Sequence, residues 1–149
     1  MTSSRLTVDN SCGEAFAEKV AVELNRAERY RVFVSLTVID LGAVREALGD
    51  KVSDLFLDVS NRVRELVRAC DHVALLNNSC LAVLQPETPR QGAEIAAKRL
   101  AAVVQNRIME ALGDNADRTI PVEIASYPDT AGARTLTSFL EALGRKTQN

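Results

Sequence analysis

Histidine and cysteine, which supply most metal ligands and all disulfide bridges, are scarce in this sequence. One histidine, His72, and three cysteines, Cys12, Cys70 and Cys80, occur among 149 residues. The cysteines are odd in number and show neither a Cys-x-x-Cys motif nor a Cys/His spacing, so no zinc site and no disulfide framework is indicated. We expect plain thiols, and a half-buried strand histidine in preference to a proton shuttle or a metal ligand.

An excess of positive charge and a long apolar run are also absent. The chain has 18 Lys and Arg against 20 Asp and Glu, so no general basic surface attracts a nucleic acid polymer or an anionic membrane. The longest apolar run, residues 32–39, is too short to span a bilayer, and residues 1–5 lead into no signal-peptide core. We expect a cytoplasmic protein that holds any anionic ligand with a local group of arginines.

The length and composition are those of one globular domain. The sequence is 46% hydrophobic and 26% charged, and it contains no internal repeat and no low-complexity tract. We expect a flexible N-terminal tail over residues 1–12 and a single domain over residues 13–149.

Hydrophobic periodicity indicates the elements of the first half. Helices are predicted over residues 14–30 and 52–69, and a short helix over 43–48 ends at Gly49, with Asp50 as the next N-cap. The β-branched run 32–39 predicts a central strand. This strand places Asp40 at its C-terminal end, where α/β proteins bind ligands.

The second half contains a predicted hairpin and a long helix. Strands 72–76 and 81–85 flank an Asn-Asn turn. Thr88, followed by Pro89 and Gln91, predicts a capping box for a helix that ends at Gly113.

A strand over residues 120–124 and a helix over 135–143 complete the chain. Pro121 indicates that this strand lies at a sheet edge or begins there. The order helix, β-α-β-β-α-β, helix predicts an α+β, ferredoxin-like fold, with an antiparallel sheet and helices on its faces.

Several segments carry a family resemblance. Residues 25–30, followed by the strand that ends at Asp40, form one of them. The segments 71–74 and 82–88 flank the hairpin, and residues 125–128 end the last strand. Together they resemble the GGDEF domain of bacterial diguanylate cyclases. The resemblance spans residues 16–143 and implies a fold like the palm of nucleotide cyclases, in a family that joins two GTP molecules into cyclic di-GMP across a dimer.

The family's signature positions have all changed. In the register of the resemblance, the Gly-Gly-Asp/Glu-Glu-Phe motif is replaced by Asn77, Asn78, Ser79, Cys80 and Leu81. Glycines let the backbone approach a nucleotide, and the acidic pair supplies a hard oxygen ligand for Mg²⁺. Asparagine tolerates the turn conformation, but serine and cysteine replace the acidic pair poorly.

Other positions of the family's active site have changed as well. Leu75 stands where the family has a phosphate-binding Arg or Lys, and Gly42 where it has the second carboxylate of Asp-x-Asp. The loop after Asp40 is shorter, with Leu48 and Ser53 near the guanine-reading positions, and the lysine segment after the last helix is missing. Asp40 alone remains, and phosphoryl transfer depends on positioning and charge neutralisation. We expect no catalytic residues, no bound metal and no cyclase activity.

A second family site is retained. Arg68 and Asp71 have the Arg-x-x-Asp spacing of the inhibitory site at which the family binds cyclic di-GMP. Arg99 matches the second arginine of that site, and Arg26 a further one found in some members. Arginine forks bind phosphate and guanine, and aspartate accepts from guanine N–H groups. The alternative is an ordinary i,i+3 surface pair at a helix end.

These residues leave three interpretations open. The first is a catalytically inactive receptor for cyclic di-GMP that acts as a homo-oligomer or on a partner signalling domain. The second is a nucleotide-independent dimerisation or protein-interaction module. The third, GTP binding without turnover, is disfavoured by Leu75 and the missing lysine.

Overall fold

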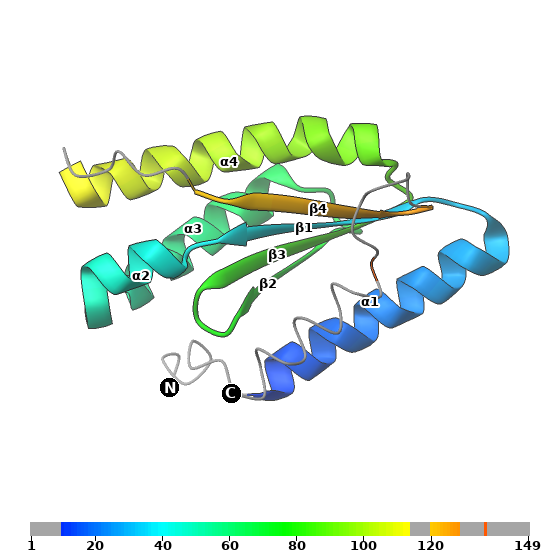
Figure 1. Cartoon of the computed structure of the whole chain (residues 1–149), viewed down its shortest axis with the longest axis horizontal. Helices are drawn as coiled ribbons and strands as arrows, with labels where there is room; N and C mark the ends of the chain where they lie inside the picture. The colour runs from blue at the N-terminus through cyan, green and yellow to red at the C-terminus, as the bar shows by residue number, and fades with distance from the viewer. Residues whose placement is uncertain (1–9, 114–119, 129–135, 137–149) are drawn as a thin grey trace.

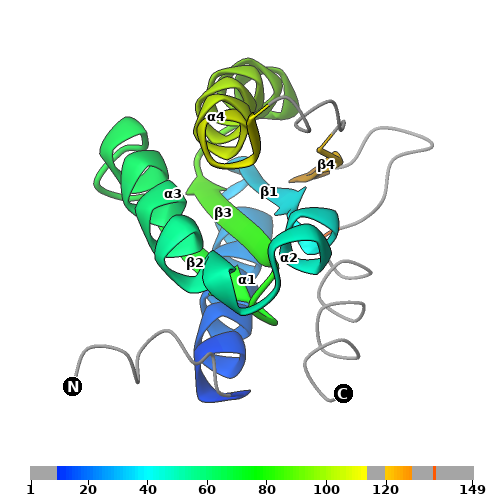
Figure 2. The same cartoon turned by 90° about the vertical axis from the view of Figure 1, so that its left-hand side faces the viewer.

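A four-stranded antiparallel sheet forms the centre of the protein, with strand order β2-β3-β1-β4. The computed structural model describes residues 10–113, 120–128 and 136. In this part of the chain α1 covers one face of the sheet, and α3 and α4 cover the other (Figures 1 and 2). The elements are α1 (Asn10–Tyr30), β1 (Val34–Asp40), α2 (Gly42–Leu48), the 3₁₀ turn η2 (Gly49–Lys51), α3 (Val52–Leu66), β2 (His72–Leu76), β3 (Cys80–Pro86), α4 (Arg90–Leu112) and β4 (Val122–Tyr127). The predicted fold class and β-α-β-β-α-β order are confirmed.

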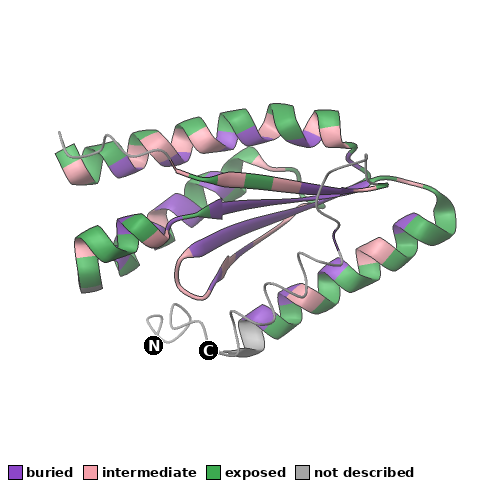
Figure 3. Cartoon of the chain, in the orientation of Figure 1, coloured by how far each residue is buried: buried purple, intermediate pink, exposed green. Residues whose placement is uncertain are grey.

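Both faces of the two central strands are buried (Figure 3). Leu36 of β1 and Leu84 of β3 pack with α1 in one core, while Ile39 and Val83 pack with α3 and α4 in the other. Side chains alternate between the faces of a strand, so burial on both faces requires the nearly continuous apolar runs that the sequence contains.

The hairpin turn forms as predicted and needs no glycine. Asn77 and Asn78 have φ values of 56° and 60°, and the Ser79 N–H donates to the Leu76 carbonyl at 3.1 Å. Two left-handed residues in a two-residue loop match the twist of the flanking strands, and asparagine is the non-glycine residue that most readily adopts this conformation.

Helix ends differ from the prediction. The first helix begins at Asn10, inside the segment predicted as a tail. The 3₁₀ turn contains Asp50, and Lys51 precedes α3, so the predicted N-cap at Asp50 is wrong. The same helix ends at Leu66 instead of residue 69 because Val67 is extended, with ψ at 165°.

The predicted capping box is also wrong. Pro89 is the N-cap residue of α4, and it makes no side-chain capping bond. The Thr88 hydroxyl instead donates to the Pro86 carbonyl at 3.0 Å.

The predicted helix over 135–143 lies outside the described residues except for Leu136, which is buried. Within the described chain, no helix has both the length and the apolar composition that crossing a bilayer requires.

An ion pair joins the two helices on one face of the sheet. Asp58 of α3 accepts from Nε of Arg107 on α4 and, at 3.1 Å, from Nε of Arg62. The Arg107 hydrogen bond, more than any other contact, holds the pKa of Asp58 below its ordinary value of 3.8.

This pair predicts a loss of stability in acid. A carboxyl group whose folded pKa lies below its unfolded pKa contributes stability above about pH 4, and loses it as pH falls through the folded value. We expect Asp58→Asn to lower the melting temperature at pH 7, and the gap to the wild type to narrow toward pH 3. Arg107→Gln should lower the melting temperature at pH 7 in the same way. The double variant should melt at nearly the same temperature as either single variant. A gap of equal size at both pH values would contradict this account.

Candidate ligand-binding site

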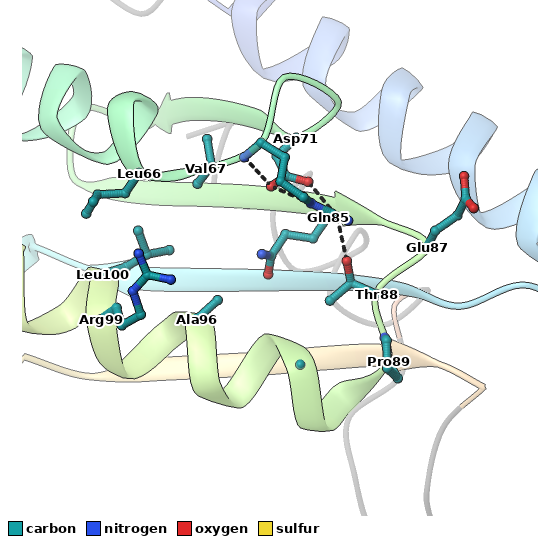
Figure 4. Close-up of a pocket in the computed structure, with 12 residues that line it drawn as sticks. Leu66, Val67, Asp71, Gln85, Glu87, Thr88, Pro89, Ala96, Arg99 and Leu100 are labelled. Atoms are coloured by element: carbon teal, nitrogen blue, oxygen red, sulfur yellow. Dashed lines mark hydrogen bonds and ion pairs between the residues drawn. The ribbon is translucent and has the colours of Figure 1, made fainter.

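A pocket of about 320 Å³ opens where the end of α3, the end of β3 and the start of α4 meet. It exists because α4 presents small residues to it. Gly92 and Ala96 of α4 line it. Ala96 lies across the pocket from Leu66 and Val67 (Figure 4). Without long side chains on this turn of α4, the space between the two helices stays open above the sheet.

Arg68 and Asp71 lie at one end of this pocket and form an ion pair. Nη2 of Arg68 donates to Oδ1 of Asp71 at 2.9 Å, and the Arg68 backbone N–H donates to Oδ2 at 2.9 Å. The Asp71 side chain is 1% exposed, whereas that of Arg68 is 52% exposed. The hydrogen bond to Asp71 raises the pKa of the Arg68 guanidinium above its ordinary value. Arg68 is therefore a permanent cation anchored on a buried carboxylate.

Arg68 also connects two loops. Its Nη2 donates to the Pro86 carbonyl at 2.8 Å and to Oγ1 of Thr88 at 2.6 Å. These bonds connect the α3–β2 loop to the β3–α4 connection. Sequence analysis missed this role because the partners lie 18 and 20 residues along the chain, and no local pattern marks them.

Arg99 reaches the pocket from α4. It lines the cavity and is exposed, and it has no hydrogen bond or ion pair with any residue in the described part of the chain. The structure therefore brings together three of the predicted site residues, Arg68, Asp71 and Arg99, from two separate segments. One of the two arginines is anchored and the other is available.

Arg26 does not line the pocket. Its Nη2 is 3.3 Å from Oε2 of Glu87, which does line the pocket, and its Nη1 is 3.6 Å from Oε1 of Glu23. Glu87 adopts a left-handed conformation, with φ at 52°, and extends from the pocket toward α1 (Figure 4). Arg26 is thus linked to the site through an acidic residue that sequence analysis did not select.

Gln85 is the other pocket residue that sequence analysis missed. It lies on β3 with 5% of its surface exposed, and its Oε1 atom has no hydrogen-bond partner among the residues that the structure describes. A glutamine within the apolar run of a central strand was the available signal.

The hairpin lies at the opposite end of β3 from the pocket. Asp40 pairs with Cys80 in the register of β1 and β3, and the Leu41 N–H donates to the Ser79 carbonyl at 2.7 Å. Nη1 of Arg45 contacts the Asn77 carbonyl at 3.3 Å. The five predicted positions of the altered site, Asp40, Asn77, Asn78, Ser79 and Cys80, are therefore close neighbours.

The chemistry of these positions is limited. Oδ1 of Asp40 accepts the Gly42 N–H at 2.9 Å, which turns the chain into α2, and Cys80 is 5% exposed. A Cβ atom at Gly42 would lie 3.1 Å from the same Oδ1. In the parts of the chain that the structure describes, no three His, Cys, Asp or Glu residues come together as a candidate metal site.

Solved structures share this fold. The GGDEF domain of TpbB (YfiN) from Pseudomonas aeruginosa has a TM-score of 0.59 at 24% identity, over 91% of this chain and 80% of that one. Diguanylate cyclase SiaD from the same organism, solved in complex with its activator SiaC, has a TM-score of 0.55 at 15% identity, over 91% of this chain and 52% of that one. The active GGEEF domain of a Vibrio cholerae diguanylate cyclase has a TM-score of 0.53 at 15% identity, over 78% and 75%.

The family assignment follows from the sequence itself. No curated protein matches the chain. Residues 13–143, however, match the family described as "Diguanylate cyclase, GGDEF domain", which is most of the 149 residues. This span contains both the hairpin and the pocket, and the chain therefore belongs to the GGDEF domain family.

Proposed function

We propose that this chain is a catalytically inactive GGDEF domain that binds cyclic di-GMP in the pocket between α3 and α4, and acts as a cytoplasmic receptor or regulatory module. The observation that carries the proposal is the convergence of Arg68, Asp71 and Arg99 on one cavity. At the hairpin, by contrast, Asp40 has no second carboxylate at Gly42 and no acidic pair at Ser79 and Cys80.

The pocket offers the chemistry that a cyclic dinucleotide requires. Arg99 is an exposed cation, and ligand binding would break no bond between it and another described residue. Arg68 bonds its neighbours through Nε and Nη2. Its Nη1 group has no partner among the described residues and would be left for phosphate or guanine. Arginine forks make bidentate, charge-assisted bonds to phosphates and stack on bases. The ligand would lie between a fixed cation on the α3–β2 loop and an adaptable one on α4.

The size of the pocket suggests how signalling would follow. A volume of about 320 Å³ is at the lower end of the range of about 300–1,000 Å³ for small-molecule sites. It suits part of a dinucleotide, with the remainder exposed to a second surface. A ligand held in this way would connect two copies of the domain or a partner signalling domain, and would shift the population toward the bound assembly.

Arg99→Ala provides the clearest test, because Arg99 has no partner in the described structure to lose. We expect calorimetric titration with cyclic di-GMP to show binding to the wild type, and a loss of affinity of about tenfold to a hundredfold in the variant, since hydrogen bonds to charged groups contribute about 1.5–3 kcal/mol. The melting temperature without ligand should not change. Lys98→Ala is the matched control, since Lys98 is the adjacent, exposed cation of α4 and does not line the pocket.

Absence of heat with the wild-type protein would contradict the proposal. Equal affinities of Arg99→Ala and Lys98→Ala would remove this pocket as the site. If the wild type binds no nucleotide, the second candidate remains, an interaction module that acts without a nucleotide. It is supported by Ile95 and Met109, which are 66% and 47% exposed and lie fourteen positions apart on one face of α4.

A further inference from the structure

The floor of the pocket holds a buried polar atom that pairs with none of the residues that the structure describes. Gln85 is 5% exposed, lines the cavity, and lies between the two helices in the close-up of the site (Figure 4). Its Oε1 lacks a hydrogen-bond partner among the described residues. Buried side-chain acceptors are nearly always paired, and leaving one unpaired destabilises the folded protein.

The walls above Gln85 form an apolar slot. Leu66 and Val67 line it on the side of α3, and Gly92 and Ala96 line it on the side of α4. Ligand sites typically combine apolar walls with a few polar groups that fix orientation. A flat ring that enters this slot edge-on would place its edge against the amide.

We propose that Gln85 receives the edge of a purine base, with a ring or exocyclic N–H of the base donating to Oε1. The inference rests on the proposed function, which supplies guanine as the base. Guanine presents the N1–H donor beside the O6 acceptor, and a carboxamide complements both, since its oxygen accepts and its NH₂ group donates. Gln85 would then orient the base, while Arg68 and Arg99 hold the charged part of the ligand at the mouth.

A purely structural glutamine is the alternative, and the chain offers a matched control for it. Thr37 of β1 is fully buried, and its Oγ1 also lacks a partner in the described structure. Thr37 does not line the pocket. Each of the two residues therefore has a buried side-chain oxygen with no partner among the described residues, and both lie on the same sheet. Of the two, only Gln85 lines the pocket, where a ligand can contact it.

The experiment compares Gln85→Met with Thr37→Val. Both variants keep the approximate shape of the side chain and remove the unpaired oxygen, so both should fold, with melting temperatures equal to or above that of the wild type. In calorimetric titrations with cyclic di-GMP, we expect Gln85→Met to bind about tenfold more weakly, as for the loss of one hydrogen-bonded base contact. Thr37→Val should bind like the wild type.

Each other result has a distinct meaning. Wild-type affinity in Gln85→Met would overturn the role of Gln85 and leave the proposed function standing. An equal loss in both variants would assign the effect to sheet packing and also overturn it. A melting temperature lowered in Gln85→Met alone would show that the amide is structural. No binding by the wild type would overturn this inference and the proposed function together.

Discussion

Arg68→Ala is expected to destabilise the domain by about 2 kcal/mol, as well as to abolish binding of cyclic di-GMP. The variant loses the bond to the buried Asp71 carboxylate and the bonds to Pro86 and Thr88 that connect two loops. Breaking a fully buried ion pair costs about 3–5 kcal/mol. The value is lower here because the Arg68 side chain is 52% exposed and the Asp71 carboxylate keeps the Arg68 backbone N–H as a donor.

Thermal unfolding provides the measurement. For a chain of this size, the expected fall in melting temperature is about 4–8 °C. Arg64→Ala is the matched control, because Arg64 is an exposed arginine near the end of α3, four residues before Arg68. Its contacts with described residues are long, at 3.4 Å, to Asn61 and Val73. This variant should stay within about 0.5 kcal/mol of the wild type. Equal melting temperatures for the two variants would contradict the structural role of Arg68.

This double role affects how binding data are interpreted. A loss of affinity in Arg68→Ala has two causes, direct contact with the ligand and disorder of the loop that carries Asp71. Arg68→Lys separates them in part, since it keeps the charge but loses the planar fork. Arg99→Ala therefore remains the better test of ligand contact, and Arg68→Ala the better test of how the pocket is held together.

The second large expected effect is on catalysis. With GTP and Mg²⁺, the purified protein is expected to form cyclic di-GMP at least about a thousandfold more slowly than an intact cyclase, since one charge-stabilising group in phosphoryl transfer contributes about 10³–10⁵-fold. Asp40 accepts a hydrogen bond from the Gly42 N–H. Cys80, which pairs with Asp40 in the sheet, is buried. Leu75 supplies no positive charge. None of the three residues Asp40, Cys80 and Leu75 supplies a positive charge against a triphosphate.

The control for this measurement is Asp40→Asn. Any product formed by the wild type and lost in Asp40→Asn would come from this hairpin, and would overturn the account of an inactive site. Product formed equally by both proteins would identify a contaminating cyclase. The variant also loses the Gly42 contact in part, so its melting temperature should be compared with that of the wild type.

The turn and the strands could be predicted because their causes are local. The run at 32–39 is apolar at nearly every position, as a strand buried on both faces requires. Asn77 and Asn78 are the residue type that adopts left-handed φ without glycine. Helix ends were predicted less well, since the Thr88 hydroxyl bonds to Pro86 and Arg68, and this tertiary bonding removes it from the capping box that its sequence indicates.

The sequence by itself determined the order of the elements and the family. It also identified Arg68, Asp71 and Arg99 as candidate ligand-binding residues. All of these depend on local patterns or on positions in a motif. Only the tertiary structure decided which contacts each residue makes. The packing of α3 and α4 opened the pocket at Gly92 and left Arg99 without a partner among the described residues. The approach of α1 to the β3–α4 connection placed Arg26 beside Glu87. The tertiary structure also buried Gln85 with no described residue bonded to its Oε1 atom, since contacts between distant segments depend on packing, which no local pattern encodes.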